Sequence, residues 1–247
     1  DRAAACGSPL VTLGRDVRVA REPGCGRGDL VHYFGLRNDW HGLRCALRGP
    51  HQAQNAGVAL AALEVIAEVR PQLRVEPADV RRGLGGVLWP GRCEWLRASP
   101  PGGRQGAPPI ILDGAHNPAG MTALVGALKE AGADRVLFVL GAMADKDIEG
   151  MLRALVPVCA EVIAVAADTP RAVTPEVLAA AMSARAPSVP VHVGGTVAAG
   201  VQRALARQHD TRYPICVAGS LAVVAEARQA LAQNGDRGSG ESGECDT

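Results

Sequence analysis

The chain of 247 residues lacks the patterns that mark membrane, secreted and metal-binding proteins. No apolar run approaches about 18 residues, so we expect no membrane-spanning helix. The first residues contain no basic segment followed by an apolar one, so no secretory signal is expected. None of the seven cysteines lies in a CxxC pair or at metal-ligand spacing with a histidine, which argues against a zinc site and a disulfide framework. These absences favour a cytoplasmic protein with reduced thiols.

An excess of charge of one sign is also lacking. The formal net charge is +1, from 26 basic and 25 acidic residues, so the composition indicates no nucleic-acid partner. Lysine is nearly absent, because only Lys129 and Lys146 accompany the arginines. The hydrophobic share of 47% and the charged share of 21% are those of an ordinary globular protein, long enough for one large domain or two small ones.

The common nucleotide and catalytic motifs are missing as well. A phosphate loop requires GxxxxGK followed by Ser or Thr, and neither lysine follows a glycine or precedes Ser or Thr. Gly24, Gly26 and Gly28 lack the third glycine of the GxGxxG fingerprint at the proper place. No GxSxG elbow and no HExxH cluster occurs. We therefore assign no catalytic residue and no metal ligand from the motifs in this chain.

The first part of the chain is expected to be mostly helical from residue 35 to residue 87, with a short strand before it. Within residues 49–69, Ala56, Leu60 and Leu63 stand at i, i+4 and i+7, as one buried helix face requires. Pro71 ends this helix, and Pro77 suits the first turn of a shorter one.

The stretch WPGR, residues 89–92, has the composition of a turn and precedes a change in the spacing of apolar residues, which predicts a domain boundary. Beyond it, short apolar runs alternate with amphipathic helix patterns, which predicts an α/β domain with a mostly parallel sheet covered on both faces. The Gly- and Pro-rich residues 100–108 are expected to lie in a hairpin that adds an antiparallel edge. The predicted strands lie at 93–98, 109–114, 135–141, 161–167, 189–194 and 213–219. The predicted helices lie around 121–128 and at about 146–158, 175–185, 196–208 and 220–232.

The two ends of the chain suggest further expectations. Residues 234–247 are polar and glycine-rich, which predicts a disordered tail. The chain begins without methionine, which fits a fragment or a processed product.

The stretch ILDGAHNPAG, residues 110–119, places an acid, an imidazole and an amide after a predicted strand. Ligands of open α/β sheets collect at such carboxyl ends. Asn117 and Pro118 suit the N-cap and first position of a helix, whose exposed N–H groups attract phosphate or carboxylate. Asp113 could accept hydrogen bonds from a ribose or amine, and His116 offers a donor and an acceptor. The alternative interpretation is that Asp113 and His116 only cap the loop.

Two further strand ends carry weaker signals. In GAMADKD, residues 141–147, Lys146 lies between two aspartates, and a solvated turn with a helix N-cap is the favoured interpretation. AGSL, residues 218–221, is a turn of small residues that permits close backbone packing or ligand approach.

Taken together, five stretches resemble the folylpolyglutamate synthase and dihydrofolate synthase family of Mur-ligase-like amide ligases. The resemblance covers about Gly7 to Arg228 and rests on HQAQNAGVALAAL, WPGRCEWL, ILDGAHNPAG, LGAMADKD and VAGSL. It implies a Rossmann-like, mostly parallel α/β domain of the Mur ligase C-terminal type, preceded by the partial end of an α/β ATPase domain. The implied divisions are a truncated ATPase part at 1–89, a hinge at 90–92, the C-terminal domain at 93–233 and the tail at 234–247.

The family resemblance also implies an ATP site. In the family, the asparagine of HQxxN, the arginine of PGR and the aspartate of DGAHN contact ATP; these are Asn55, Arg92 and Asp113 here, with His116 beside them. The magnesium ligands, the phosphate loop and most of the pterin site are expected in a part that this chain lacks. The implied partners are ATP, L-glutamate and a folate or dihydropteroate; the complete protein is expected to be a monomer, and the fragment alone is expected to be inactive.

The implied reaction makes an amide through an acyl phosphate: ATP phosphorylates the folate or dihydropteroate carboxylate, and the amino group of glutamate displaces phosphate. Two alternatives stay open at this point. The chain could be a non-catalytic nucleotide-binding or interaction module, or part of a peptidoglycan-type Mur ligase.

Overall fold

The computed structural model describes residues 2–24, 28–96 and 108–237. Contacts divide the chain into two compact units, Asp1–Trp89 (unit 1) and the residues from Pro90 onward (unit 2). The segment 238–247 of the predicted tail lies outside the described residues, but 234–237 are the end of a helix that runs to Arg237. No helix in the described part of the chain is long and apolar enough to cross a membrane.

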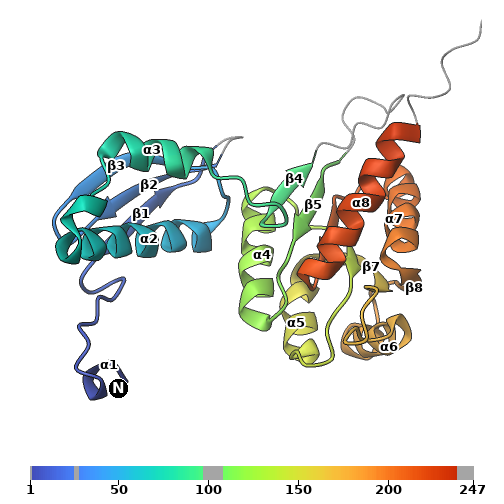
Figure 1. Cartoon of the computed structure of the whole chain (residues 1–247). Helices are drawn as coiled ribbons and strands as arrows, with labels where there is room; N and C mark the ends of the chain where they lie inside the picture. The colour runs from blue at the N-terminus through green and yellow to red at the C-terminus, as the bar shows by residue number, and fades with distance from the viewer. Residues whose placement is uncertain (1, 25–27, 97–107, 238–247) are drawn as a thin grey trace, which may run out of the picture. The chain divides into compact units, whose positions relative to one another are not determined.

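Unit 1 contains a three-stranded antiparallel sheet in the order β1-β2-β3, together with two longer helices (Figure 1). The helix predicted at 49–69 and the mostly helical character of residues 35–87 are confirmed, but this range also contains β3, which was not predicted. The strands are β1 (Arg18–Glu22), β2 (Asp29–Phe34) and β3 (Asp39–Cys45). The helices are α1 (Arg2–Ala5), α2 (Pro50–Val69), a 3₁₀ turn (Pro71–Leu73) and α3 (Pro77–Gly86).

One face of the unit 1 sheet supplies its core. Val31, Tyr33 and Leu43 are fully buried and pack with Leu60 of α2 and Val80 of α3. Alternate residues of a strand point to opposite faces, so β2 turns its intervening residues away from these helices. The result is a small sheet with one packed face, as antiparallel sheets allow.

Unit 2 contains a six-stranded sheet in the order β4-β5-β9-β6-β7-β8, in which only the β4–β5 pair is antiparallel. All six predicted strands and the antiparallel edge are confirmed; residues 97–107, which include most of the predicted Gly- and Pro-rich hairpin segment, lie outside the described residues. The strands are β4 (Glu94–Leu96), β5 (Ile110–Asp113), β6 (Val136–Leu140), β7 (Cys159–Ala166), β8 (Val191–Thr196) and β9 (Ile215–Ala218). The helices are α4 (Pro118–Glu130), α5 (Ile148–Leu155), a 3₁₀ turn (Val156–Val158), α6 (Pro175–Arg185), α7 (Val197–Thr211) and α8 (Leu221–Arg237).

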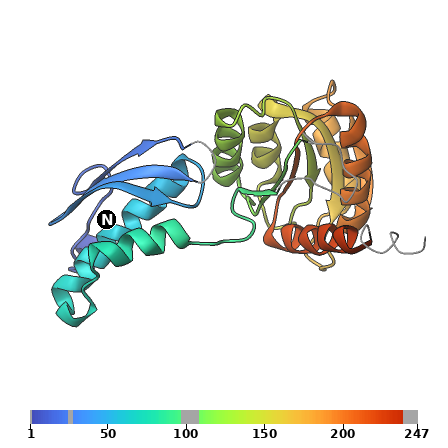
Figure 2. The same ribbon diagram turned by 90° about the horizontal axis from the view of Figure 1, so that it is seen from above.

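Helices cover both faces of this sheet, as the continuous apolar strands require (Figure 2). Phe138 and Leu140 of β6 join the core beneath α4, α5 and α6. Leu137 and Val139 of the same strand join the core beneath α7 and α8. The chain passes from β5 to β6 on one face and returns through α7 to insert β9 between them. This reversal of strand order marks the edge where ligands of open α/β sheets bind.

The outer strands of the unit 2 sheet are short or irregular. Within the residues that the structure describes, β4 has three residues, Glu94–Leu96. In β8 the register with β7 shifts so that Gly194 is an extra residue between Val193 and Gly195. Such a bulge bends the strand and increases its twist.

The small-residue turn after β9 brings two backbones into direct contact. Gly219 has φ 111°, and a Cβ added to it would lie 1.6 Å from the carbonyl oxygen of Gly141 at the end of β6. Only glycine fits both the left-handed backbone and this close approach. The sequence allowed close packing or ligand approach at AGSL, and the structure shows close packing.

We expect Gly219→Ala to destabilise unit 2 by more than about 4 kcal/mol, because it adds both backbone strain and an overlap with Gly141. The matched control is Gly126→Ala in α4, where an added Cβ meets nothing within 4 Å. That control should stabilise the helix by about 0.5 to 1 kcal/mol. The unfolding of each variant can be measured in urea, with hydrogen exchange of peptides from unit 2 reporting how much of that unit is unfolded. Equal urea midpoints for the two variants would contradict this prediction.

Candidate functional site

Three loops meet at the carboxyl edge of the unit 2 sheet. Asp113 at the end of β5 pairs with Ala218 at the end of β9, and Ala218 pairs with Leu140 at the end of β6. DGAHNP, AGSL and GAMADKD therefore follow adjacent strand ends. Backbone register alone places these three predicted segments side by side.

A turn at residues 90–94 is bonded to the same edge. The Cys93 amide donates to Asp113 Oδ2 at 2.7 Å, and the Gly114 amide donates to the Gly91 carbonyl at 2.8 Å. Gly91 and Cys93 both have left-handed backbones, with φ 75° and φ 46°. A left-handed cysteine is uncommon, so this conformation depends on the bonds that hold it. Arg92 lies between these two residues and is thereby fixed next to the DGAHNP loop.

Asp113 is only 5% exposed, and both of its carboxylate oxygens accept backbone N–H groups. Oδ2 accepts from Cys93, and Oδ1 accepts from Ala115 at 2.7 Å. The capping role that the sequence left as the alternative is therefore present. The carboxylate of Asp113 thus joins the turn at 90–94 to the DGAHNP loop.

His116 is half-buried, and its ring is oriented by its own loop. Nδ1 lies 2.8 Å from the carbonyl oxygen of Gly114. A carbonyl only accepts, so Nδ1 carries the proton and donates. In the neutral ring this leaves Nε2 as an acceptor, and within the described part of the chain Nε2 has no hydrogen-bond partner. The imidazole can thus accept a hydrogen bond from a ligand.

The next helix begins as the sequence predicts. Asn117 is the N-cap of α4, its Oδ1 accepts from the Gly120 amide at 2.7 Å, and Pro118 occupies the first position. The start of α4 therefore lies beside His116, where the helix dipole favours a negative group.

Asn55 belongs to unit 1 and lies on the exposed side of α2. Its Nδ2 donates to Gln52 Oε1 at 3.2 Å, and Gln52 Nε2 lies 3.0 Å from His51 Nε2. The motif HQxxN thus forms one polar chain at the start of the helix. The structure brings Arg92, Asp113 and His116 together, whereas Asn55 lies in the other unit.

The GAMADKD loop has the structural role favoured from its sequence. Asp147 caps α5 by accepting from the Gly150 amide at 2.9 Å. Lys146 and Arg171 both pair with Asp145, and hydrogen bonds from Arg171 and then Lys146 lower the pKa of Asp145 to about 2. Among the residues that the structure describes, no group of three His, Cys, Asp or Glu side chains could hold a metal ion.

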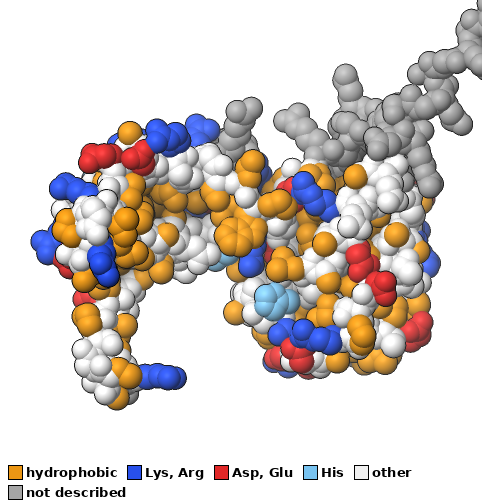
Figure 3. Space-filling model, viewed as in Figure 1, with side chains coloured by type: hydrophobic (Ala, Val, Ile, Leu, Met, Phe, Trp, Pro, Cys, Tyr) orange, Lys and Arg blue, Asp and Glu red, His pale blue; other side chains and the backbone are white. Residues whose placement is uncertain are grey.

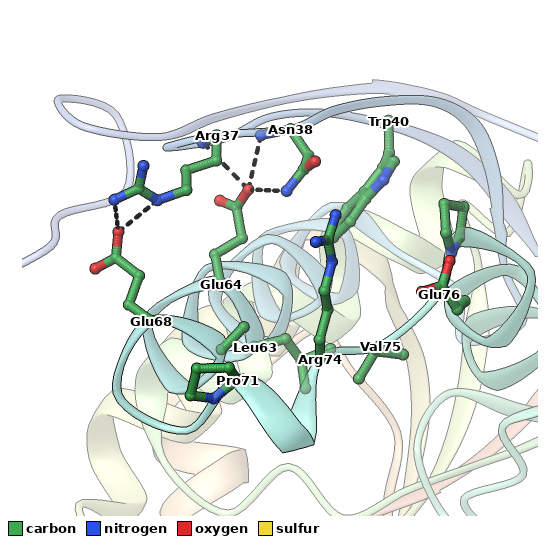
Figure 4. Close-up of a pocket in the computed structure, with 12 residues that line it drawn as sticks. Arg37, Asn38, Trp40, Leu63, Glu64, Glu68, Pro71, Arg74, Val75 and Glu76 are labelled. Atoms are coloured by element: carbon green, nitrogen blue, oxygen red, sulfur yellow. Dashed lines mark hydrogen bonds and ion pairs between the residues drawn. The ribbon is translucent and has the colours of Figure 1, made fainter.

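A hollow of about 640 Å³ lies within unit 1 and was not foreseen from the sequence (Figure 4). On one side, Glu64 accepts from the Tyr33 hydroxyl, from the Leu36, Arg37 and Asn38 amides, and from the Asn38 side chain. Glu68 pairs with Arg37 beside it. Because these acids already hold the β2–β3 hairpin against α2, we assign the hollow to packing.

Sequence reasoning missed two residues at the edge of unit 2. Glu94 Oε2 accepts from the Gly91 amide at 2.9 Å, and Glu94 Oε1 pairs with Arg228 of α8. Because Glu94 follows Gly91 by three residues, the sequence could have suggested the hydrogen bond between them. No local pattern could link Glu94 to an arginine 134 residues away.

Comparisons with known proteins show which family this chain resembles. A family model described as Mur ligase, glutamate ligase domain, matches residues 91–221. The dihydrofolate synthase/folylpolyglutamate synthase of Mycobacterium tuberculosis is 36% identical over 179 residues, which are 72% of this chain and 34% of that protein.

Two solved structures extend the likeness to both units. The M. tuberculosis folylpolyglutamate synthase complexed with ADP has a TM-score of 0.81 at 29% identity, covering 92% of this chain and 50% of that one. The Escherichia coli FolC in complex with DHPP and ADP has a TM-score of 0.74 at 25% identity, covering 94% and 49%. The chain thus spans about half the length of these solved proteins.

We expect Asp113→Ala to destabilise unit 2 by about 3 kcal/mol, because two backbone N–H groups lose their buried acceptor. Asp147→Ala is the matched control, since it removes an exposed aspartate that accepts one backbone N–H group and should cost only about 1 kcal/mol. Urea unfolding of the two variants gives the comparison. A loss for Asp113→Ala no larger than for Asp147→Ala would contradict the buried role.

Glu64 should make unit 1 sensitive to acid. Burial alone would raise the pKa of Glu64, but hydrogen bonds from Tyr33, Leu36 and Asn38 outweigh it and lower the pKa below its usual value. The resulting stabilisation is complete above the unfolded pKa of about 4.3 and is lost as the pH falls through the folded pKa. We expect Glu64→Gln to cost about 2 kcal/mol at pH 7 and to flatten the fall in stability below pH 5.

The control for this measurement is Glu68→Gln, one helical turn further along α2, whose side chain is 44% exposed. It should change stability by less than about 1 kcal/mol at any pH. Unfolding of unit 1 between pH 3 and pH 7 tests both variants, and parallel pH profiles for wild type and Glu64→Gln would refute the assignment.

Proposed function

Because the chain belongs to the folylpolyglutamate synthase/dihydrofolate synthase family, we propose that it forms part of a ligase joining L-glutamate to a folate or dihydropteroate carboxylate. Its unit 2 corresponds to the Mur-type glutamate ligase domain. We assign unit 1, residues 1–89, to the end of an ATPase domain. The main observation behind this proposal is that hydrogen bonds join the turn at 90–94 to the DGAHNP loop. They place Arg92 beside Asp113 and His116 at the carboxyl edge of the sheet.

The chemistry of the substrate explains why such a ligase needs ATP. A carboxylate is a poor acyl donor, because its leaving group would be oxide. Transfer of the γ-phosphoryl group of ATP to a carboxylate oxygen gives an acyl phosphate. The amino group of glutamate then attacks the acyl carbon, the amide bond forms, and phosphate leaves with the former carboxylate oxygen while the amine loses a proton.

The site residues suit the nucleotide in this scheme. The planar guanidinium of Arg92 can bind two phosphate oxygens at once. Asp113 bonds the backbone of the turn and of its own loop and so holds Arg92 and His116 in place for the nucleotide, and Nε2 of His116 can accept from a neighbouring donor. The amide of Asn55 can bond the base or the sugar. In this proposal these groups bind and orient ATP, and no residue of the chain acts as the nucleophile.

Magnesium is expected with ATP in such reactions. The described residues contain no cluster that would hold it. We propose that the magnesium ligands correspond to residues in the half of the relatives that this chain does not match.

An exposed apolar face of α2 supports the need for additional polypeptide. Val58, Ile66 and Val69 are 56%, 40% and 71% exposed and recur at i, i+8 and i+11 on one side of the helix. Hydrophobic side chains are visible at the surface of unit 1 (Figure 3). A helix that is apolar on both sides is normally covered on both sides.

The test is a chimera that joins this chain to the unmatched half of the M. tuberculosis synthase. It should add glutamate to dihydropteroate or a folate with consumption of ATP. Arg92→Ala should lower kcat/KM for ATP by about 100-fold, and Arg92→Lys by less, because lysine keeps the charge without the two-point fork. The control is Arg153→Ala, an exposed arginine of α5.

Three outcomes would count against the proposal. Equal effects of Arg92→Ala and Arg153→Ala would remove Arg92 from the ATP site. Addition of amino acids to nucleotide-linked peptide precursors, but not to pterin substrates, would favour a peptidoglycan-type ligase. Tight ATP binding by the chain alone, without ligase activity in the chimera, would favour a non-catalytic module.

A further inference from the structure

Helix α8 packs one of its faces against the turn that carries Arg92. A Cβ added to Gly91 would lie 2.7 Å from Val224, and one added to Gly114 would lie 2.4 Å from Leu221. Leu221, Val224 and Arg228 are spaced i, i+3 and i+7, so they share one side of the helix. The same helix face therefore touches both segments of the Arg92–Asp113 site.

Glu94 connects this helix face to the backbone of the turn. One carboxylate oxygen accepts from the Gly91 amide at 2.9 Å, and the other pairs with the guanidinium of Arg228. The Glu94 side chain is 21% exposed and the Arg228 side chain is 48% exposed, so water screens the pair from the Arg228 side. A charged acceptor also forms a stronger bond to an amide than a neutral one.

The turn is held at three backbone positions. Cys93 N–H is bonded to Asp113 and the Gly91 carbonyl to Gly114, both on the β5 side. The third position, the Gly91 amide, is held by Glu94 and through it by α8. Because Cys93 is left-handed without being a glycine, loss of one of these bonds should release a conformation that is intrinsically disfavoured.

We infer that Glu94 and Arg228 are positioning residues whose ion pair fixes the Gly91 amide and thereby directs Arg92 toward the phosphates of ATP. This inference rests on the proposed function. Neither residue touches the nucleotide in this scheme. Their effect reaches ATP only through the geometry of the turn.

The first test uses the chain as it is and does not depend on ATP. Cys93 is 4% exposed, so its thiol reports opening of the turn. Alkylation by iodoacetamide, mapped to each cysteine by mass spectrometry, should be about tenfold faster at Cys93 in Arg228→Met than in wild type. Arg228→Lys keeps the ion pair and should restore the slow rate.

The chain supplies internal and matched controls. Burial raises the pKa of the Cys45 and Cys216 thiols, so both should stay slow in every variant. Asp79→Asn removes an exposed ion pair to Arg82 in α3 and should leave Cys93 slow. A Cys93 rate in Arg228→Met equal to that in wild type would overturn the inference.

The second test separates positioning from general stability in the active chimera. Glu94→Ala and Arg228→Met should raise KM for ATP by about tenfold, the value of one charge-assisted bond, with kcat within about twofold of wild type and KM for glutamate unchanged. Arg228→Lys should restore KM. A merely structural role would lower kcat through loss of folded enzyme and leave KM for ATP unchanged, which would overturn the inference.

The outcome for Arg92 distinguishes the two proposals. If Arg92→Ala raises KM for ATP but Arg228→Met does not, the positioning role fails and the proposed function stands. If Arg92→Ala leaves KM for ATP unchanged while Arg228→Met speeds the alkylation of Cys93, Arg92 does not belong to the ATP site. The effect of the Glu94–Arg228 pair on the conformation of the turn would then still hold.

Discussion

The carboxylate of Asp113 is the constraint on which the candidate site depends. It bonds the Cys93 amide, 20 residues earlier in the chain, and the Ala115 amide in its own loop. A single buried acid thus joins the turn that carries Arg92 to the loop that carries His116. The turn contains a left-handed non-glycine residue, and loss of the acceptor would leave two buried N–H groups without compensation. Site geometry and the stability of unit 2 therefore depend on the same charge.

Much of unit 2 could be predicted from the sequence because its signals are local. Buried parallel strands are short apolar runs, and the helices between them show regular apolar spacing, so all six strands were found. Asn117 and Pro118 likewise define the start of α4 through their own backbone preferences. The strand ends then place DGAHNP, AGSL and GAMADKD together, because parallel strands end at one edge.

The remaining features depend on contacts that no local pattern encodes. In unit 1 a short strand before residue 35 was predicted and corresponds to β2, but β1 and β3 were missed because they are largely exposed and show only a weak alternation. Glu64 stands among apolar residues of α2, and its role appears only when the β2–β3 hairpin folds onto it. No local pattern predicts that Glu94 pairs with Arg228 and not with another arginine. Tertiary packing selects these partners.

The irregular outer strands of unit 2 have a consequence for the behaviour of the folded chain in a crowded solution. A long flat rim would present a row of open N–H and C=O groups to any passing polypeptide. Here one rim is a strand of three residues in the described part of the chain, and the other rim is bent where Gly194 is inserted. Both rims are thus poor templates for adding a foreign strand, which protects a highly apolar sheet from lateral growth into aggregates.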